Sequence, residues 1–139
     1  HLIVRNNKIS DLNGEMDEIV VWKTWPLNQK LGLAVGNVGL GVSRTFQIDD
    51  AGPKELTNWS DKRVMYVTPG EKKGYWLLLA VNALNNETFG VYRFNEKSIN
   101  TLFQILDLGE KSFSSIALWH EDLYLGSSDG KVYKSRAKK

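Results

Sequence analysis

The 139-residue chain has no cysteine, which excludes disulfide bonds and thiolate metal sites. Its only histidines are His1 and His120, so a two-histidine metal site would need the first residue of the chain, and we expect no metal. The longest apolar run, residues 75–81, is far too short to cross a bilayer. The N-terminus also lacks the pattern of a signal peptide. We therefore expect no membrane insertion by this segment.

Neither sign of charge is in large excess. Eighteen basic residues against sixteen acidic ones give a net charge of +2, and only the tail at residues 134–139 is distinctly basic. This balance gives no extended basic surface, so we expect no nucleic-acid partner. The glycine-rich stretch 32–41 lacks the lysine and the following helix of a phosphate-binding loop, and we expect no cofactor.

What the chain does contain is a succession of short apolar runs separated by turn residues. No apolar pattern with a 3.6-residue period persists, which indicates an all-β protein. The clearest run, residues 113–119, is almost continuous, as in a strand buried on both faces. The other predicted strands cover residues 2–4, 8–12, 18–22, 31–35, 41–48, 54–59, 63–68, 75–81, 89–94, 99–108, 123–125 and 131–135. We expect their core to include Val20, Leu33, Val64, Met65, Leu78, Leu79, Ile116 and Leu118.

These strands repeat along the chain. Second strands begin near Gly32, Leu77 and Leu123, at intervals of 45 and 46 residues (77 − 32 and 123 − 77). Third strands carry GVSR at 41–44, GVYR at 90–93 and KVYK at 131–134. Four short antiparallel strands per unit of about 40 to 50 residues are typical of β-propeller blades. We therefore predict an antiparallel β-propeller segment of about three four-stranded blades, with a β-sandwich as the alternative.

The predicted blade-like units cover residues 15–60, 61–109 and 110–139, after a hairpin at 1–14. The whole, residues 1–139, is a single domain or a fragment of a longer protein. Propeller rings close with about four to eight blades, so three blades leave a ring open. We expect a companion chain, a second copy or a missing part of the chain to complete it, because uncovered blade faces need a partner.

Two stretches resemble a known family. They are SDKRVMYVTPGEKKGYWLLLAVN at 60–82 and KSFSSIALWHEDLYLGSSDGKVYKS at 111–135. Both resemble the last part of the sialidase-like propeller of the trypanosomal trans-sialidase superfamily. Members share a basic residue before an apolar strand ending in Thr and Pro, a Lys-Gly turn, an L-x-L-W strand, an aromatic-Ser-Ser segment and a D-x-L-Y strand. Asp129 and Gly130 also resemble a degenerate Asp-box that ends in Tyr133.

The resemblance implies little chemistry for this chain. In active members a tyrosine in the aromatic-Ser-Ser segment attacks the anomeric carbon, but that position is Phe113 here, and a phenyl ring has no oxygen. The family holds the sialic acid carboxylate with three arginines, and no arginine of this chain matches that triad. We assign no catalytic residue and leave open whether the parent protein is an enzyme, with a non-catalytic role preferred.

Four residues are candidates for binding. Trp25 and Trp59 lie beside polar residues and strand ends, where an exposed ring could stack on a sugar or a partner side chain. Most propeller aromatics instead fill the space between blades. Arg44 and Arg93 fall at the same place in successive GVxR strands, which also fits basic residues repeated on a solvated face.

Two acceptor sequons, at Asn58 and Asn86, lie in predicted loops and are candidates for glycosylation. They favour an extracellular or cell-surface location.

The preferred interpretation is a non-catalytic interaction module, a β-propeller part that binds a protein or glycan partner at a cell or parasite surface. One alternative is that the chain supplies the C-terminal blades of a sialidase-like or trans-sialidase-like glycosidase whose catalytic groups lie elsewhere. The other alternative is an intracellular scaffold propeller.

Overall fold

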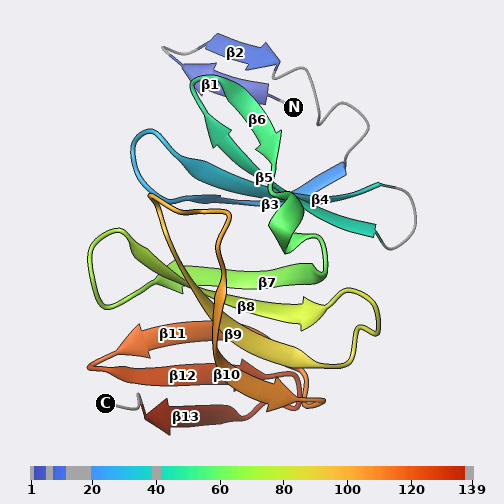
Figure 1. The fold of residues 1–139 in the computed structure, drawn as a ribbon, viewed down its shortest axis with the longest axis vertical. Coiled ribbons are helices and arrows are strands. Elements are labelled where there is room, and N and C mark those ends of the chain that lie inside the picture. Colours follow the sequence, from blue (N-terminus) through green and yellow to red (C-terminus); the bar gives the residue numbers. More distant parts are fainter. Residues whose placement is uncertain (1, 6–7, 12–19, 39–41, 137–139) are drawn as a thin grey trace. The chain divides into compact units, whose positions relative to one another are not determined.

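A computed structural model describes residues 2–5, 8–11, 20–38 and 42–136 (Figure 1). The described residues are all-β, as predicted, and the one helix among them is a single 3-10 turn. The chain divides into two compact units, His1–Ser60 and Asp61–Lys139. The predicted turns at 6–7 and 13–14, residues 18–19 of a predicted strand, the basic tail at 137–139 and His1 lie outside the described residues.

The first unit contains a hairpin and a four-stranded antiparallel sheet of order β3-β4-β5-β6. The hairpin pairs β1 (Leu2–Arg5) with β2 (Lys8–Asp11). The sheet strands are β3 (Val20–Pro26), β4 (Gly32–Val38), β5 (Val42–Asp49) and β6 (Gly52–Glu55). Each sheet strand therefore pairs with the next one along the chain.

The fourth strand differs from its prediction. The sequence predicts a strand at 54–59, but β6 ends at Glu55 and Thr57–Trp59 form the 3-10 turn. Pro53, which lies within β6, is tolerated because β6 is an edge strand and one edge of its backbone needs no partner. The Trp59 indole is buried in this turn and does not continue the alternation of the strand. The strand therefore ends at Glu55, earlier than the sequence predicts.

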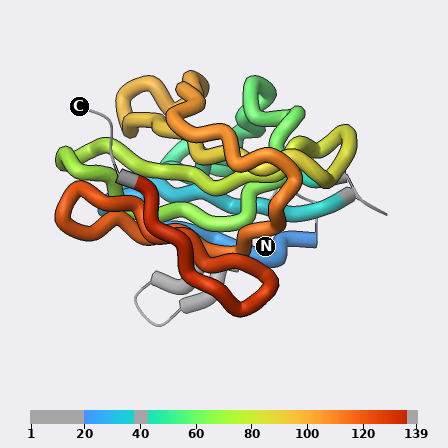
Figure 2. Tube along the Cα trace, turned by 90° about the horizontal axis from the view of Figure 1, so that it is seen from below, coloured from blue at the N-terminus to red at the C-terminus, as the bar shows by residue number. Residues whose placement is uncertain are grey.

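The second unit contains two antiparallel sheets, of order β10-β9-β8-β7 and β11-β12-β13. The strands of the larger sheet are β7 (Lys62–Pro69), β8 (Tyr75–Asn82), β9 (Phe89–Asn95) and β10 (Phe103–Gly109). The smaller sheet contains β11 (Phe113–Trp119), β12 (Asp122–Ser127) and β13 (Val132–Arg136), which form the last part of the trace in Figure 2. It has one strand fewer than the other two large sheets, and no described strand pairs with the outer edge of β13.

The strand predicted at 99–108 begins only at Phe103. The side-chain oxygen of Asn95 accepts hydrogen bonds from the backbone N–H groups of Lys97 and Ser98, which turns the chain after β9. Ile99 lies in this turn and is nevertheless buried. Because Ile99 is apolar, the sequence predicts a strand that begins too early, inside this turn.

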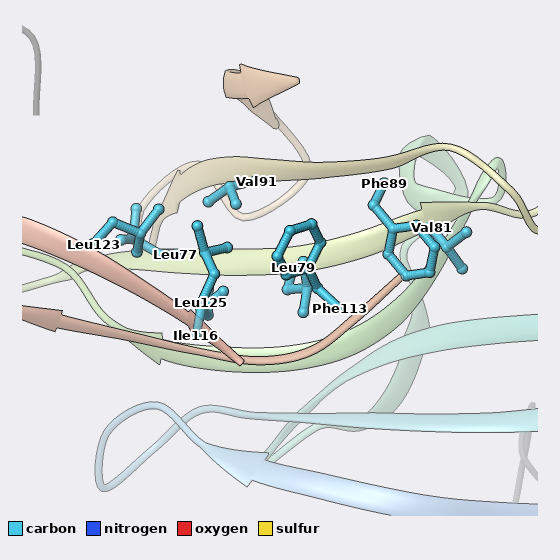
Figure 3. Packing of buried hydrophobic residues seen from close by; sticks show 9 residues of the cluster. All are labelled: Leu77, Leu79, Val81, Phe89, Val91, Phe113, Ile116, Leu123 and Leu125. Atoms are coloured by element: carbon cyan, nitrogen blue, oxygen red, sulfur yellow. The ribbon is translucent and has the colours of Figure 1, made fainter. Parts of the chain in front are cut away.

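The two sheets of the second unit pack face to face around an apolar cluster (Figure 3). Leu77, Leu79 and Val81 alternate along β8 and point toward the side chains of the smaller sheet. The other members of the cluster are Phe89, Val91, Phe113, Ile116, Leu123 and Leu125. Strand β8 is also buried on its other face, where Leu78 has 0% and Ala80 has 1% of its surface exposed.

Most of the predicted core residues are buried, but three of the eight are not. Val20 is 72% exposed, because it begins the edge strand β3. Met65 and Leu118 are only partly buried, against the apolar cluster. The other five predicted core residues are buried: Leu33, Val64, Leu78, Leu79 and Ile116.

Strand β11 is buried on one face, not on both as the apolar run predicts. Phe113 and Ile116 are buried, whereas Ala117 and Trp119 are exposed, the latter to 63%. A β-bulge at Ser114, between the buried residues Phe113 and Ile116, resets the alternation of the strand.

All three large sheets carry a bulge in their first strand, opposite the second strand. The bulges lie between Val21 and Lys23, between Val64 and Tyr66, and between Phe113 and Ser115. The second-strand residues paired at the bulge are Gly36, Ala80 and Ser127, at intervals of 44 and 47 residues (80 − 36 and 127 − 80). The sequence-based intervals of 45 and 46, taken between strand starts, therefore each differ by one residue from the intervals between bulges. Aligning the sheets one residue out of register exchanges their two faces.

We expect Leu79→Ala to destabilise the chain by about 2 to 5 kcal/mol, because Leu79 is fully buried between the two sheets. Urea denaturation measures this loss. Leu84→Ala is the matched control, because Leu84 is 88% exposed and its truncation should leave the denaturation midpoint unchanged. Equal effects of the two truncations would contradict the assigned core.

Candidate functional site

A cleft of about 700 Å³ opens between the two sheets of the second unit. Leu77 and Leu123 belong both to the cleft wall and to the apolar cluster, so the cleft continues the core outward. Leu106 and Leu118 add further apolar surface. A cleft with an apolar floor and a few charged groups at its rim is typical of a binding site.

Arg93 lies at the rim of this cleft and is exposed. Its backbone pairs with Leu77 on one side and Phe103 on the other, so the three side chains share one face of the sheet. The guanidinium carbon lies 6.0 Å from the ring centroid of Tyr75 and 6.0 Å from that of Phe103. Among the described residues its guanidinium has no hydrogen bond or ion pair, so two rings position a cation that is free to bind an anion.

The remaining charged groups of the cleft come from turns and from the edge strand β10. The β7–β8 turn supplies Glu71 and Lys72, and β10 supplies Asp107. Glu121 comes from the β11–β12 turn, in which both His120 (φ 49°) and Glu121 (φ 68°) have left-handed backbones. Such conformations cost non-glycine residues on the order of 1 kcal/mol each, so the turn is strained where it holds Glu121 at the cleft.

The bulge register separates the two arginine candidates. Arg93 pairs with Leu77, whereas Arg44 pairs with Gly36, and these partners are not equivalent when the bulges are aligned. The expectation that Arg44 and Arg93 fall at the same place is therefore wrong. Arg44 is held by a two-pronged ion pair with Glu55, with 3.0 Å between Nε and Oε2, and its guanidinium lies over the Phe46 ring. Arg44 has a structural role.

The two tryptophan candidates lie in the first unit. Trp59 is only 1% exposed, so its expected position at the surface is wrong and its ring cannot stack on a ligand. Trp25 is half-buried in β3, with the Lys23 ammonium 5.1 Å from its ring centroid. The structure thus brings none of the other three candidates into the cleft with Arg93.

Phe113 packs into the apolar cluster and is 4% exposed. Its ring meets that of Tyr133 edge to face, with centroids 5.8 Å apart. Phe113 is therefore a core residue of the second unit.

The Asp-box-like sequence forms the tight β12–β13 turn. The Asp129 carboxylate accepts a hydrogen bond from the Lys131 backbone N–H and an ion pair from Lys111, at 3.1 and 3.2 Å. Gly130 has φ of 87°, which this turn requires. A hydrogen bond with the Ser127 side chain is the largest cause that lowers the pKa of Asp129, and Lys111 lowers it further. Side-chain hydrogen bonds raise the pKa of Lys111, the one with Tyr133 having the largest effect and the one with Asp129 the next largest.

Both glycosylation candidates are accessible. Asn58 is exposed in the 3-10 turn, and Asn86 is exposed in the β8–β9 turn. Both therefore present their amides outside the strands, as acceptor sites require.

A second surface feature is the outer face of the smaller sheet, which we call the open face. Its residues alternate with those of the apolar cluster and are Ser115, Ala117, Trp119, Asp122, Tyr124, Gly126, Val132 and Lys134, of which Lys134 and Asp122 form an ion pair at 3.3 Å. Trp119 is 63% and Val132 is 73% exposed. The Trp119 ring lies 6.0 Å from that of Tyr124, and Gly126 leaves room for the Ser115 side chain, which a Cβ would contact at 2.4 Å. The open face thus combines exposed apolar residues, Ala117, Trp119 and Val132, with half-buried ones.

Sequence reasoning missed both the cleft and the open face. The lining of the cleft comes from several strands and turns that only the packing of two sheets brings together. The open face had a signal in the sequence, the alternation of Ser115, Ala117 and Trp119, but the unbroken apolar character of the run obscured it.

Two structural features are absent from the described part of the chain. No three histidine, aspartate or glutamate side chains there are grouped so that they could hold a metal ion. No helix there has the length and apolar character that crossing a membrane requires.

We expect Phe113→Tyr to give no sialidase activity and to destabilise the chain by roughly 1 to 3 kcal/mol, because a phenol hydroxyl would enter an apolar cluster. Hydrolysis of a fluorogenic sialoside and urea denaturation measure the two effects. Phe103→Tyr is the control, since Phe103 is 54% exposed and can place a hydroxyl in water. Sialidase activity in either variant or in the unmodified chain would contradict the assignment of Phe113 to the core.

The low pKa of Asp129 makes the β12–β13 turn sensitive to acid. A carboxyl group whose folded pKa is depressed stabilises the fold above its unfolded pKa, and this stabilisation is lost as the pH falls through the folded value. We therefore expect Asp129→Asn to be less stable than the unmodified chain at neutral pH. The difference should shrink as the pH falls below 3.8, the ordinary value of the group. Thermal unfolding across pH measures it, and a difference that persists unchanged in strong acid would refute the assignment.

Comparisons with known proteins identify no family. No family model matches the chain, and no curated protein matches it. Among solved structures it is similar to the crystal structure of the computationally designed Ika4 protein, with a TM-score of 0.45 and 12% identity, over 95% of this chain and 74% of that chain. A TM-score at this level does not establish a shared fold.

Proposed function

We propose that this chain is a non-catalytic interaction module and that the open face of the β11–β13 sheet is its docking surface for a further β-sheet. The observation that carries the proposal is the equivalence of two sheet faces. When the bulges are aligned, Leu77, Leu79 and Val91 of the larger sheet correspond to Tyr124, Gly126 and Val132 of the smaller one. The first set is buried against a sheet, and the second set lies on the open face.

The equivalence extends to the charged end of each face. Arg93 of the larger sheet pairs with Leu77, and Lys134 of the smaller sheet pairs with Tyr124. Because Leu77 and Tyr124 correspond, Arg93 and Lys134 correspond too. Each cation lies 6.0 Å from an aromatic ring centroid, Arg93 over Tyr75 and Lys134 over Tyr124. Corresponding surfaces therefore occur on both sheets. The surface of the larger sheet is covered by the smaller sheet, and this supports a further sheet as the occupant of the open face.

A β-propeller gives this arrangement a larger context. Sheets in sequential strand order that pack face to face are the building blocks of a propeller, and an open stack of them needs further sheets to close. In that context the chain is a sialidase-like propeller segment, as its resemblance implies. The buried position of Phe113 supports an interaction role over a catalytic one. The accessible sequons at Asn58 and Asn86 support a role outside the cell or at its surface.

Where no companion chain is present, the sheet that docks is that of a second copy. We expect sedimentation equilibrium to give a mass above the 15.8 kDa of one chain, rising with concentration. Trp119→Glu should shift the equilibrium to the monomer, because it places a charge on the exposed apolar surface of the open face, at the end of β11. Leu84→Glu is the matched control, since Leu84 is as exposed but lies outside the open face.

Two results would overturn the proposal. One is a stable monomer at every concentration, folded cooperatively. The other is association that Trp119→Glu and Leu84→Glu weaken equally.

A further inference from the structure

The geometry points to a second binding site, independent of the open face: the cleft beside β10 takes an extended peptide that carries an acidic residue, which Arg93 binds. The peptide would pair with the unoccupied edge of β10 and direct alternate side chains into the cleft. This inference concerns a partner segment and does not depend on how the sheets assemble.

The edge of β10 is the first observation. Strand β10 ends the larger sheet, and no described strand pairs with its outer edge. Phe103 and Ile105 are 54% and 47% exposed on it, and Asp107 is its only charged residue. Edge strands that avoid pairing usually carry several charges, a proline or a bulge. Strand β10 has one charge and no proline, and its two irregularities, at Ile105 and Leu108, interrupt its pairing with β9, so its outer edge can accept a short added strand.

The cleft is the second observation. Ile105, Leu106 and Asp107 of β10 line it, so a strand added to that edge would border it directly. The apolar floor of Leu77, Leu118 and Leu123 fits an aliphatic side chain. A peptide can place an aliphatic side chain on this floor while its backbone pairs with β10, which a sugar cannot do, and this favours a peptide over a glycan.

Arg93 supplies the charge complementarity. It shares a cross-strand row with Phe103, at the start of β10, and its guanidinium has no anionic partner among the described residues. The next row inward on the same face pairs Val91 with Leu106. These rows are two residues apart on β9 and three apart on β10, where Ile105 is the extra residue. A regular peptide strand laid along the rows, like β9, would carry an aliphatic residue two positions from its acidic one.

The other charged groups of the cleft are Glu71, Lys72, Asp107 and Glu121, and Asp107, which lies on β10 itself, sets the direction of this pattern. Asp107 pairs with Gly90, further along β10 than the row of Arg93, and its carboxylate also accepts a hydrogen bond from the Gly109 N–H. An acidic residue placed beside Asp107 would be repelled, whereas one placed beside Arg93 and Phe103 would be attracted. The acidic residue therefore belongs at the start of β10.

The test uses a fluorescein-labelled peptide of about ten residues with one Leu-x-Glu element between Ser and Thr residues. Fluorescence anisotropy measures its binding to the full chain. We expect saturable binding that Arg93→Gln weakens about 10-fold, the loss of one charge-assisted interaction of roughly 1.4 kcal/mol. A matching Leu-x-Gln peptide should bind more weakly to the unmodified chain and be indifferent to Arg93→Gln.

Three controls determine whether the peptide binds at this cleft and through the edge of β10. Lys97→Gln removes the same charge from an exposed turn outside the cleft and should leave binding unchanged. Trp119→Glu, on the open face, should also leave it unchanged, so failure of the docking proposal does not affect this result. A peptide with N-methylated backbone amides should lose binding, because it cannot pair with the edge of β10.

The proposal is overturned if the Leu-x-Glu peptide does not bind, or if Arg93→Gln and Lys97→Gln weaken its binding equally. Binding that survives N-methylation would overturn the pairing with β10. Binding of glucuronic acid at Arg93 with no binding of the peptide would show a saccharide site instead.

Discussion

The second unit depends on one interaction, the burial of the leucine stripe of β8 between two sheets. Leu77 and Leu79 alternate toward the smaller sheet while Leu78 and Ala80 are buried on the opposite face, so β8 is buried on both faces from residue 77 to residue 81. A run such as LLLAV suits this position, because neither set of its side chains has to meet water. The cleft continues this packing outward from Leu77, which Arg93 pairs with in the neighbouring strand. Arg93 therefore extends from a strand at the end of the core, which fixes its backbone position.

The bulges in the first strands control which face of each sheet meets a neighbour. One extra residue in the first strand reverses the alternation beyond it, so an error of one residue in the repeat exchanges inner and outer faces. With the bulges aligned, the face that the larger sheet buries and the open face of the smaller sheet become the same face of two successive units. Val132 then has a physical reason to be apolar and exposed: it occupies the position that Val91 holds in the larger sheet, where another sheet covers it.

The sequence predicted the existence and order of the strands well, because turn residues such as those at 69–70 and 129–130 separate short apolar runs. It could not predict the bulge at Ser114, which leaves no compositional trace, and so β11 was expected to be buried on both faces. Trp59 was misplaced for a related reason: polar neighbours indicate a surface, but a 3-10 turn rotates a single side chain inward. Arg93 was found as a candidate through a false equivalence with Arg44, and only the register shows that it stands at the cleft while Arg44 is paired with Glu55. The cleft itself combines residues that are distant in sequence, and no local pattern marks it.

The central claim is that the open face is covered when the protein assembles. Hydroxyl-radical footprinting of Trp119 across a range of protein concentrations tests it most directly, with Phe103 as the internal reference because it is exposed on a different sheet. The account predicts that oxidation of Trp119 falls as the concentration rises while that of Phe103 stays constant. Oxidation of Trp119 that is the same at all concentrations, in a sample that does associate, would contradict it.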